Sequence, residues 1–213
     1  MTEPILYDYW RSSAGYRVRI ALNLKRIAYE SVAIDLLDGA QRSDDYRARN
    51  PQGLVPMLEM DGLKLTQSLA IIDYLDASIR EPRLVPEDAG ERAHVLALAL
   101  TVACDIHPLN NLRVQRYLKD PLGHDEAARD TWYRHWVREG LATLEALAAP
   151  RAGRFLFGDA PTLADICLVP QLYNARRFDV ALDDYPTLTA ADAEASRLNP
   201  FAAAHPNRVA PGG

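Results

Sequence analysis

The pattern of apolar residues changes once along this chain, at a proline-bounded segment near residue 82. Before it, short apolar runs typical of strands alternate with helical stretches, and after it nearly every segment has a helical period. An alternating region followed by a wholly helical one is typical of an α/β unit joined to an all-helical unit. The sequence therefore predicts two domains, residues 1–81 and 88–213, joined by a linker at residues 82–87.

The first domain is predicted to have the order β, α, β, an ill-defined helical stretch, β, β, α. Asp61-Gly62 lies between two short apolar runs, which is a strong signal for a β-hairpin. Strands are expected at residues 5–9, 29–34 and 55–66, the last range being the hairpin, and helices at residues 16–25 and 68–79.

The second domain is predicted to be helical, with helices at residues 88–118, from about 125 to 150, and from 162 onward. Pro108 should kink the first of these helices. Thr162 and Asp165 form a capping-box pattern at the start of the last one. Residues 202–213 show no helical period and are expected to form a weakly ordered tail.

Composition excludes several classes of function. The 213 residues carry 24 basic and 29 acidic side chains, and this mildly acidic balance argues against nucleic acid or an anionic membrane as the main partner. The two cysteines, Cys104 and Cys167, have no Cys or His at metal-ligand spacing, so neither a disulfide framework nor a metal site is expected. No signal-peptide pattern opens the chain and no run approaches the ~20 apolar residues of a membrane span, so a cytoplasmic location is expected.

A predicted strand, two serines and a helix follow one another between Tyr9 and Arg19, and this corner is the first candidate site. Hydroxyls and backbone N–H groups at a helix N-terminus bind anions, and they lower the pKa of a thiol held there. Ser12 or Ser13 could equally be no more than a helix cap, because serine is a preferred cap residue. The residues of this corner alone leave both interpretations open.

Two further corners of the same domain have a similar character. Pro56 has no N–H to donate to a sheet, so Val55-Pro56 must open a strand or form a special turn, in which a cis bond is possible. Gln67-Ser68 opens the next helix, where side chains and a backbone N–H could hold a carboxylate, although for Ser68 alone a simple cap is the more ordinary interpretation. Three such corners in one small domain indicate a site for an anion or a peptide.

These residues carry a resemblance to the zeta class of the glutathione transferases. Val55-Pro56 stands in the place of that family's cis-proline, and Gln67-Ser68 in the place of the pair that binds the γ-glutamyl group. Arg11-Ser12-Ser13 followed by residues 17–22 resembles the zeta signature, and residues 162–165 resemble the capping box of the family's helical domain. Further matches are Asn50-Pro51 and residues 67–72, 104–111, 168–171 and 175–178, so the resemblance covers nearly the whole chain.

The resemblance implies a glutathione transferase fold, with a thioredoxin-like α/β N-terminal domain and an all-α C-terminal domain, as well as a homodimer and glutathione as the cofactor. Ser12 takes the place of the catalytic serine, with Ser13 and Arg11 as catalytic candidates beside it. Glutathione contacts carried over from the family are Ser12, Ser13, Ala14, Gly15, Tyr16, Arg17, Gln41, Val55, Gln67, Ser68, His107, Asn111, Leu112 and Arg113.

Three positions depart from the family pattern. Many members have a cysteine and a serine where this chain has Ala14 and Gly15, so no protein thiol is expected to take part in the reaction. His107 replaces a glutamine of some relatives, and on its own it would be as consistent with a helix break before Pro108.

The resemblance also implies a reaction, the cis–trans isomerisation of a maleyl double bond conjugated to a ketone. A glutathione thiolate adds to the alkene carbon, the resulting single bond rotates, and elimination restores the alkene in its trans form. Ser12 would favour the thiolate, and Arg11 would stabilise the enolate. Candidate ligands for the dicarboxylate substrate are Arg11, Arg113, Arg176 and Arg177, although most of the 21 arginines are expected to be solvated.

The expected activity is therefore the glutathione-dependent conversion of maleylacetoacetate into fumarylacetoacetate, a step of aromatic amino acid breakdown. Three alternatives stay open. They are the same isomerisation of maleylpyruvate in gentisate breakdown, a general conjugating transferase, and a non-catalytic glutathione-binding module. The presence of Ser12, Gln67 and Ser68 counts against the last of these.

Overall fold

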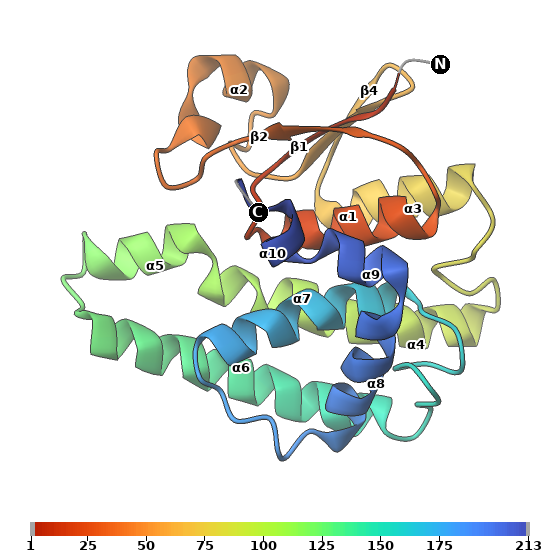
Figure 1. The fold of residues 1–213 in the computed structure, drawn as a ribbon. Helices are drawn as coiled ribbons and strands as arrows, with labels where there is room; N and C mark the ends of the chain where they lie inside the picture. The colour runs from red at the N-terminus through yellow and green to blue at the C-terminus, as the bar shows by residue number, and fades with distance from the viewer. Residues whose placement is uncertain (1–2, 212–213) are drawn as a thin grey trace. The chain divides into compact units, whose positions relative to one another are not determined.

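The computed structural model describes residues 3–211 and divides into two compact units (Figure 1). The first unit contains the residues up to Arg83 together with those from Arg197 onward, and the second contains Leu84–Ser196. The sequence pattern predicted that the residues from Arg197 onward belong to the helical domain. Their contacts instead group them with the first unit.

The first unit is built on a four-stranded mixed sheet in the order β2-β1-β3-β4. Its strands are β1 (Ile5–Asp8), β2 (Glu30–Ala33), β3 (Met57–Met60) and β4 (Leu63–Thr66). β1 and β2 are parallel, so they need a crossover, which α1 (Ser13–Leu24) supplies. β3 and β4 form the predicted hairpin, and Asp61 and Gly62 both have the positive φ of a tight two-residue turn.

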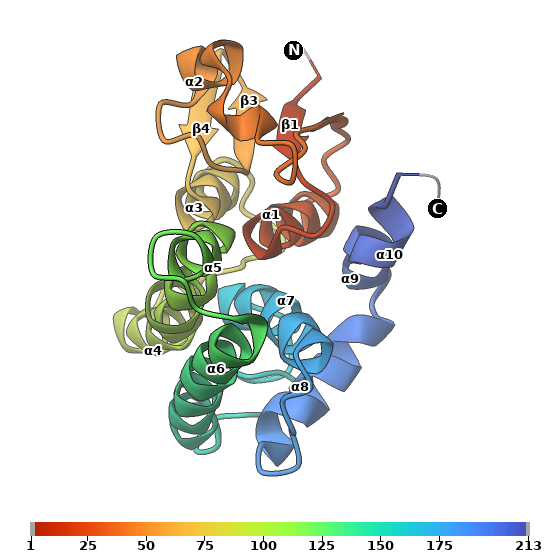
Figure 2. The ribbon, with the colours of Figure 1, turned by 90° about the vertical axis from the view of Figure 1, so that its left-hand side faces the viewer.

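Helices cover the sheet of the first unit. α1 and α3 (Ser68–Ser78) pack against each other on one face, as Figures 1 and 2 show, and α2 (Asp44–Arg49) lies beyond the other face. A short 3-10 turn, η1 (Ala40–Arg42), precedes α2 in the stretch that the sequence left ill-defined. Fully buried side chains between α1, α3 and the sheet form the main core: Leu6, Val18, Leu22, Leu58, Ile71, Ile72 and Leu75. On the α2 side, Met57 packs with Tyr7 and Tyr46.

The C-terminal segment is more ordered than the sequence predicted. It forms α9 (Asn199–Ala204) and α10 (Pro206–Val209), and α9 packs on α1 with Phe201 and Ala204 fully buried. The expectation of a weakly ordered tail is therefore wrong up to Val209, and residues 212–213 of that tail lie outside the described chain. Prolines interrupt the helical period of this segment, and contacts with α1 rather than local propensity stabilise helices this short.

The second unit is helical. Its elements are α4 (Ala89–Leu100), the π-helical η2 (Thr101–Ile106), the 3-10 turn η3 (Pro108–Asn110), α5 (Leu112–Lys119), α6 (Glu126–Ala148), α7 (Leu163–Arg177) and α8 (Pro186–Arg197). The predicted interruption at Pro108 is confirmed. The capping box of α7 is confirmed as well, because Asp165 Oδ2 accepts a hydrogen bond from Thr162 N at 2.8 Å.

One helical stretch, from Ala89 to Lys119, is long and apolar enough to cross a membrane when length and composition alone are considered. The expectation that no segment approaches such a span is therefore corrected. A single stretch of this kind is weak evidence for a membrane protein, since core helices of other proteins meet the same criterion.

Candidate active site

Ser12 caps the helix that follows the first strand. Its Oγ accepts a hydrogen bond from Gly15 N at 3.0 Å, and its own N–H donates to Tyr9 O at 2.7 Å. The cap interpretation is therefore correct for Ser12, but it uses only a lone pair of the oxygen. The hydroxyl proton is not needed for the cap, and a hydroxyl that accepts one hydrogen bond donates its own proton more strongly. Ser12 can thus cap α1 and donate to an anion at once.

Arg11 is held on the aromatic side chains of its own loop. Its guanidinium lies 4.7 Å from the centroid of the Trp10 ring, and Nη2 donates to Tyr9 Oη at 3.1 Å. The side chain is half-buried. A positive charge is therefore fixed in the residue next to Ser12, at the place where the resemblance puts a group that stabilises negative charge.

The N-terminus of α3 has the features of a carboxylate site. Its cap residue, Gln67, has a φ of 67° and makes no capping hydrogen bond through its side chain. A side chain in the left-handed region costs about 1–3 kcal/mol, and such strain is concentrated at binding sites. The Gln67 side chain donates instead to Gln52 Oε1 at 3.0 Å.

Arg17 lies beneath this helix end. It is 2% exposed, and its Nη1 is 3.4 Å from Ser68 Oγ. Among the described residues, its Nε and Nη2 have no hydrogen-bond partner. A buried cation without a counter-charge is costly, whereas a guanidinium beside a helix N-terminus matches a carboxylate well.

The loop before β3 completes this side of the site. The Val55–Pro56 bond is cis, as the resemblance implied. Gly53 approaches the backbone of Gln41 so closely that a Cβ at this position would lie 3.0 Å from Gln41 O. Gln41 is buried, and its Oε1 has no hydrogen-bond partner within the described part of the chain. These contacts and the Gln67–Gln52 bond link Gln41, the loop before β3 and the start of α3.

The predicted glutathione contacts of the second unit surround the break between η2 and α5. The backbone N–H of His107 donates to Val102 O at 3.0 Å, which is the wide spacing of a π-helix. Asn111 caps α5, and its Oδ1 accepts from Arg113 N at 3.1 Å. The π-helical turn and the break therefore bring His107, Asn111, Leu112 and Arg113 to one irregular corner, and such turns are frequent at functional sites.

The two neighbouring arginines of α7 have different environments. Arg176 Nη2 pairs with Asp192 Oδ2 at 2.7 Å, so its charge is already balanced. Arg177 Nη1 donates to the neutral Asn174 Oδ1 at 3.2 Å, and its guanidinium lies 5.7 Å from the centroid of the Phe178 ring. Arg177 is therefore the better candidate for a substrate carboxylate.

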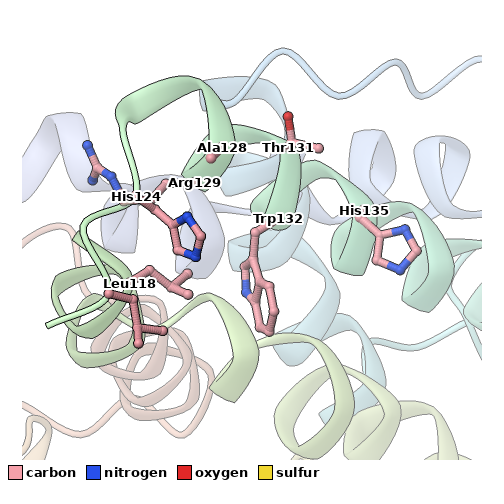
Figure 3. A pocket seen from close by; sticks show the side chains of 8 residues that line it. Leu118, His124, Ala128, Arg129, Thr131, Trp132 and His135 are labelled. Atoms are coloured by element: carbon pink, nitrogen blue, oxygen red, sulfur yellow. The ribbon is translucent and has the colours of Figure 1, made fainter.

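A separate cavity of about 430 Å³ lies between α5 and α6 (Figure 3). Its wall is mainly apolar, with Leu118, Trp132 and His135 among the lining side chains. None of the predicted site residues lines it. The sequence had no signal for this cavity, because its residues come from two helices and the turn between them.

No metal site is found within residues 3–211, where no three or more His, Cys, Asp or Glu side chains are grouped. Cys104 is exposed and Cys167 is buried, and neither forms a disulfide within residues 3–211.

Known proteins resemble this chain over its whole length. Family models of the glutathione S-transferase N-terminal and C-terminal domains match residues 6–83 and 126–204. The maleylacetoacetate isomerase of Rhizobium meliloti (strain 1021) is 52% identical over 210 residues, which are 98% of this chain and 99% of that protein.

Solved structures of similarly named proteins also match this chain. The holo structure of a bacterial maleyl pyruvate isomerase, a zeta-class glutathione S-transferase, has a TM-score of 0.95 at 45% identity and covers 98% of this chain and 100% of that one. The maleylacetoacetate isomerase of Anaeromyxobacter dehalogenans 2CP-1, with glutathione bound in its active site, has a TM-score of 0.89 at 46% identity and covers 99% and 98%.

Proposed function

Because the chain belongs to the glutathione S-transferase family, in its zeta class, we propose that it is a glutathione-dependent isomerase that converts maleylacetoacetate into fumarylacetoacetate. The observation that carries this proposal is the buried guanidinium of Arg17 at the N-terminus of α3, in the same unit as the hydroxyl of Ser12 at the N-terminus of α1. Together they supply a place for a carboxylate and a separate donor for a thiolate.

The residues of the first unit fit glutathione. The unpartnered N–H groups of Arg17 and the N-terminus of α3 match its γ-glutamyl carboxylate. Gln41 offers a buried carbonyl oxygen to one of its N–H groups. When bound, glutathione supplies a thiolate that adds to the substrate's double bond and leaves again after the bond has rotated.

Ser12 and Arg11 stabilise the negative charges of the reaction. Ser12 donates its hydroxyl proton toward the sulfur, which lowers the thiol pKa together with the positive end of the α1 dipole. Arg11 stabilises the negative charge that develops on the ketone oxygen, and its fixed position on Trp10 means that little reorganisation is needed. Ser13 supports this turn from its buried position.

The dicarboxylate needs cations as well. We assign Arg177 and Arg113 to its carboxylates, since Arg113 is exposed and Arg177 has no acidic partner among the contacts described for it. His107, Asn111 and Leu112 complete the glutathione contacts from the helical unit. We also propose a homodimer, as the zeta resemblance implies, a cytoplasmic location, and the domain division at the linker 82–87 that the sequence pattern predicts.

The second candidate is maleylpyruvate isomerisation, because a structure with that activity in its name has the TM-score of 0.95. We place maleylacetoacetate first because the relative at 52% identity carries that name, against 45% for the maleylpyruvate isomerase. The two substrates differ at the keto end, so they use the same Ser12, Arg11 and glutathione chemistry.

The test is an absorbance assay of both substrates with the purified protein, with and without glutathione. Glutathione-dependent turnover that is faster with maleylacetoacetate supports the proposal, and faster turnover of maleylpyruvate would transfer it to the second candidate. Binding of glutathione is measured separately by calorimetry. Tight binding without turnover of either substrate would instead identify a glutathione-binding module.

A further inference from the structure

Arg19 is a buried residue of α1 that belongs to neither the predicted glutathione set nor the substrate set. It is 2% exposed and forms an ion pair with Asp8, the last residue of β1. Its Nη2 donates to Trp10 O at 3.1 Å, and its Nε donates to Ala204 O at 3.1 Å. One guanidinium therefore connects the end of β1, the loop that leads to Ser12, and the last residue of α9.

The contacts of Arg19 use the planar, forked arrangement of N–H donors that a guanidinium presents. Its guanidinium points N–H groups in three directions at once, toward the Asp8 carboxylate and two backbone carbonyls that belong to distant parts of the chain. A lysine ammonium carries the same charge but presents its donors from a single atom, so it cannot reproduce this geometry.

Asp8 and Gly15 place this ion pair under the first turn of α1. A Cβ on Gly15 would overlap the carboxylate of Asp8, so the carboxylate packs directly against the Gly15 backbone. Gly15 also donates its N–H to the Ser12 hydroxyl. A shift of the Asp8–Arg19 pair would therefore be transmitted to the turn that carries Ser12.

The C-terminal segment contacts the same turn a second time. Tyr16 lies 5.3 Å from the Arg19 guanidinium, and its hydroxyl is 3.5 Å from Phe201 O. Its ring meets the His205 ring edge-on at 6.0 Å. The segment from Phe201 to His205 is thus packed against the residues that follow Ser12 and Ser13.

Lys25, the C-cap residue of the same helix, is a matched comparison that separates a role near Ser12 from a general contribution to stability. Its Nζ pairs with Asp76 at 2.7 Å and also donates to Ile79 O and Pro82 O. It is buried like Arg19 and makes as many bonds. It lies just beyond the other end of α1, and these bonds go to α3 and the segment after it rather than to the Ser12 loop.

We propose that Arg19 is a positioning residue for the isomerase reaction, which fixes the Trp10–Ser12 backbone against the C-terminal segment and so holds the Ser12 hydroxyl and the Arg11 guanidinium in place. The proposal rests on the function proposed above. It makes the segment after Leu198 a part of the active-site support, although this segment supplies no predicted catalytic or binding residue.

The test compares Arg19→Lys with the matched variant Lys25→Arg. Both exchange one buried, paired cation of α1 for another, and both are expected to lose stability toward urea. Only Arg19→Lys is expected to lower kcat, by about 10- to 100-fold, because small misplacements of reacting groups have effects of this size. It should also raise the pKa of the thiol of bound glutathione, read from the ultraviolet absorbance of the thiolate, with little change in glutathione affinity.

Equal effects of the two variants on kcat and on the thiol pKa would overturn the proposal. Hydrogen exchange of the Trp10–Gly15 amides gives a readout that needs no substrate, and faster exchange is expected in Arg19→Lys alone. If the wild-type protein turned over neither substrate, the proposed function would fail, while the thiol pKa and the exchange rates would still decide the role of Arg19.

A second variant tests the contribution of the C-terminal segment, and it covers the case in which Arg19→Lys does not fold. Phe201→Ala loosens α9 without touching Arg19, and Leu75→Ala on α3 is its control for a buried cavity in the same unit. Phe201→Ala should raise the thiol pKa and speed Trp10–Gly15 exchange, and Leu75→Ala should not. Where the double variant with Arg19→Lys folds, its effects should be less than additive. No effect of Phe201→Ala on either readout would overturn the proposal.

Discussion

Ser12 uses one oxygen for two purposes, and comparison with a variant that loses only a helix cap can separate them. Ser12→Ala removes both the helix cap and the proton donor of the site. We expect a loss of about 1 kcal/mol in unfolding free energy from the cap. We also expect a fall of about 100-fold or more in kcat at neutral pH, because a donor to a developing anion has an effect of that size.

Ser43→Ala is the matched control for this prediction. Ser43 also caps a helix in the same unit, with its Oγ accepting from Tyr46 N at 3.2 Å. It should lose similar stability and keep its kcat. Full turnover at neutral pH in Ser12→Ala would show that the cap is the only role of Ser12.

Replacing Arg17 by an apolar residue is expected to have opposite effects on the stability of the ligand-free protein and on the binding of glutathione. Its guanidinium is buried, and two of its N–H-bearing nitrogens have no partner among the described residues. Replacing a buried ionic group by an apolar one of similar length is often neutral or stabilising by about 1–4 kcal/mol. Arg17→Met should therefore melt no lower than the wild type without glutathione.

The same variant should bind glutathione about 10- to 100-fold more weakly, because a charge-assisted pair with the carboxylate is lost. Thermal unfolding with and without glutathione measures both effects, since a ligand that binds only the folded state raises Tm. A lower Tm without glutathione and an unchanged rise with it would mean that Arg17 is structural.

At the scale of elements, Gly140 explains how α6 accommodates the π-helical turn. A Cβ on Gly140 would overlap Ile106, the last residue of η2. Gly140→Ala should therefore destabilise the protein, by about 1–3 kcal/mol as measured by urea denaturation, even though alanine favours helices.

Two variants sharpen this prediction. Gly140→Ala combined with Ile106→Ala should lose less stability than the sum of the single variants, since the second substitution removes the overlap. Gly90→Ala, at an exposed helical glycine of α4, should be neutral or stabilising. A neutral Gly140→Ala would mean that η2 adjusts without cost.

Asp165, in the capping box of α7, links stability to pH. Burial raises its pKa to about 6, although Leu156 N and Thr162 N both donate to its oxygens at 2.8 Å. Between the ordinary carboxyl pKa and 6, the folded state holds a proton that the unfolded state has released. The contribution of this extra proton to the unfolding free energy is therefore fully present below pH 3.8, and it is lost as pH rises through 6.

The full effect of the shift is about 3 kcal/mol at 1.36 kcal/mol for each unit of pKa, and about 2 kcal/mol of it should be lost between pH 4 and pH 7. Asp165→Asn removes this titration, so the difference in unfolding free energy between wild type and variant should change by that amount over the same range. Urea denaturation at several pH values measures it. A pH-independent difference would mean that Asp165 is ionised throughout.

The elements that could be predicted from the sequence are those with a local signal. Asp61-Gly62 marked the hairpin, Pro108 the helix break, and Thr162 with Asp165 the start of α7. The helices α9 and α10 have no such signal, because their stability comes from Phe201 and Ala204 buried against α1. The π-helical form of η2 was also not predictable, since it depends on a glycine of α6 far along the chain.

At the scale of the whole molecule, the sequence could propose the residues of the candidate site but not the contacts that surround them. The resemblance supplied Ser12, Arg17, Gln67 and Ser68 by position alone. That Arg17 is buried with two nitrogens lacking hydrogen-bond partners among residues 3–211, or that Arg176 pairs with Asp192, depends on contacts between distant elements that no local pattern encodes. The same holds for Arg19, whose partners come from three separate parts of the chain.

The last prediction concerns the source of the reactive sulfur in the molecule as a whole. The chain has two cysteines, of which Cys104 is exposed on η2 and Cys167 is buried in α7. The signature position that holds a cysteine in many relatives is Ala14 here. All of the thiol chemistry should therefore come from glutathione, and a cysteine-free chain should still catalyse the reaction.

The variant that tests this is Cys104→Ser with Cys167→Ala. It should lose about 1 kcal/mol of stability, because the buried Cys167 behaves as a small apolar side chain. Its kcat should stay within about twofold of the wild type, and omission of glutathione should abolish turnover in both proteins. Alkylation of the wild type with iodoacetamide, followed by removal of the reagent, should also leave activity intact. Loss of activity in proportion to the alkylation of Cys104 would instead show that a thiol of the chain takes part.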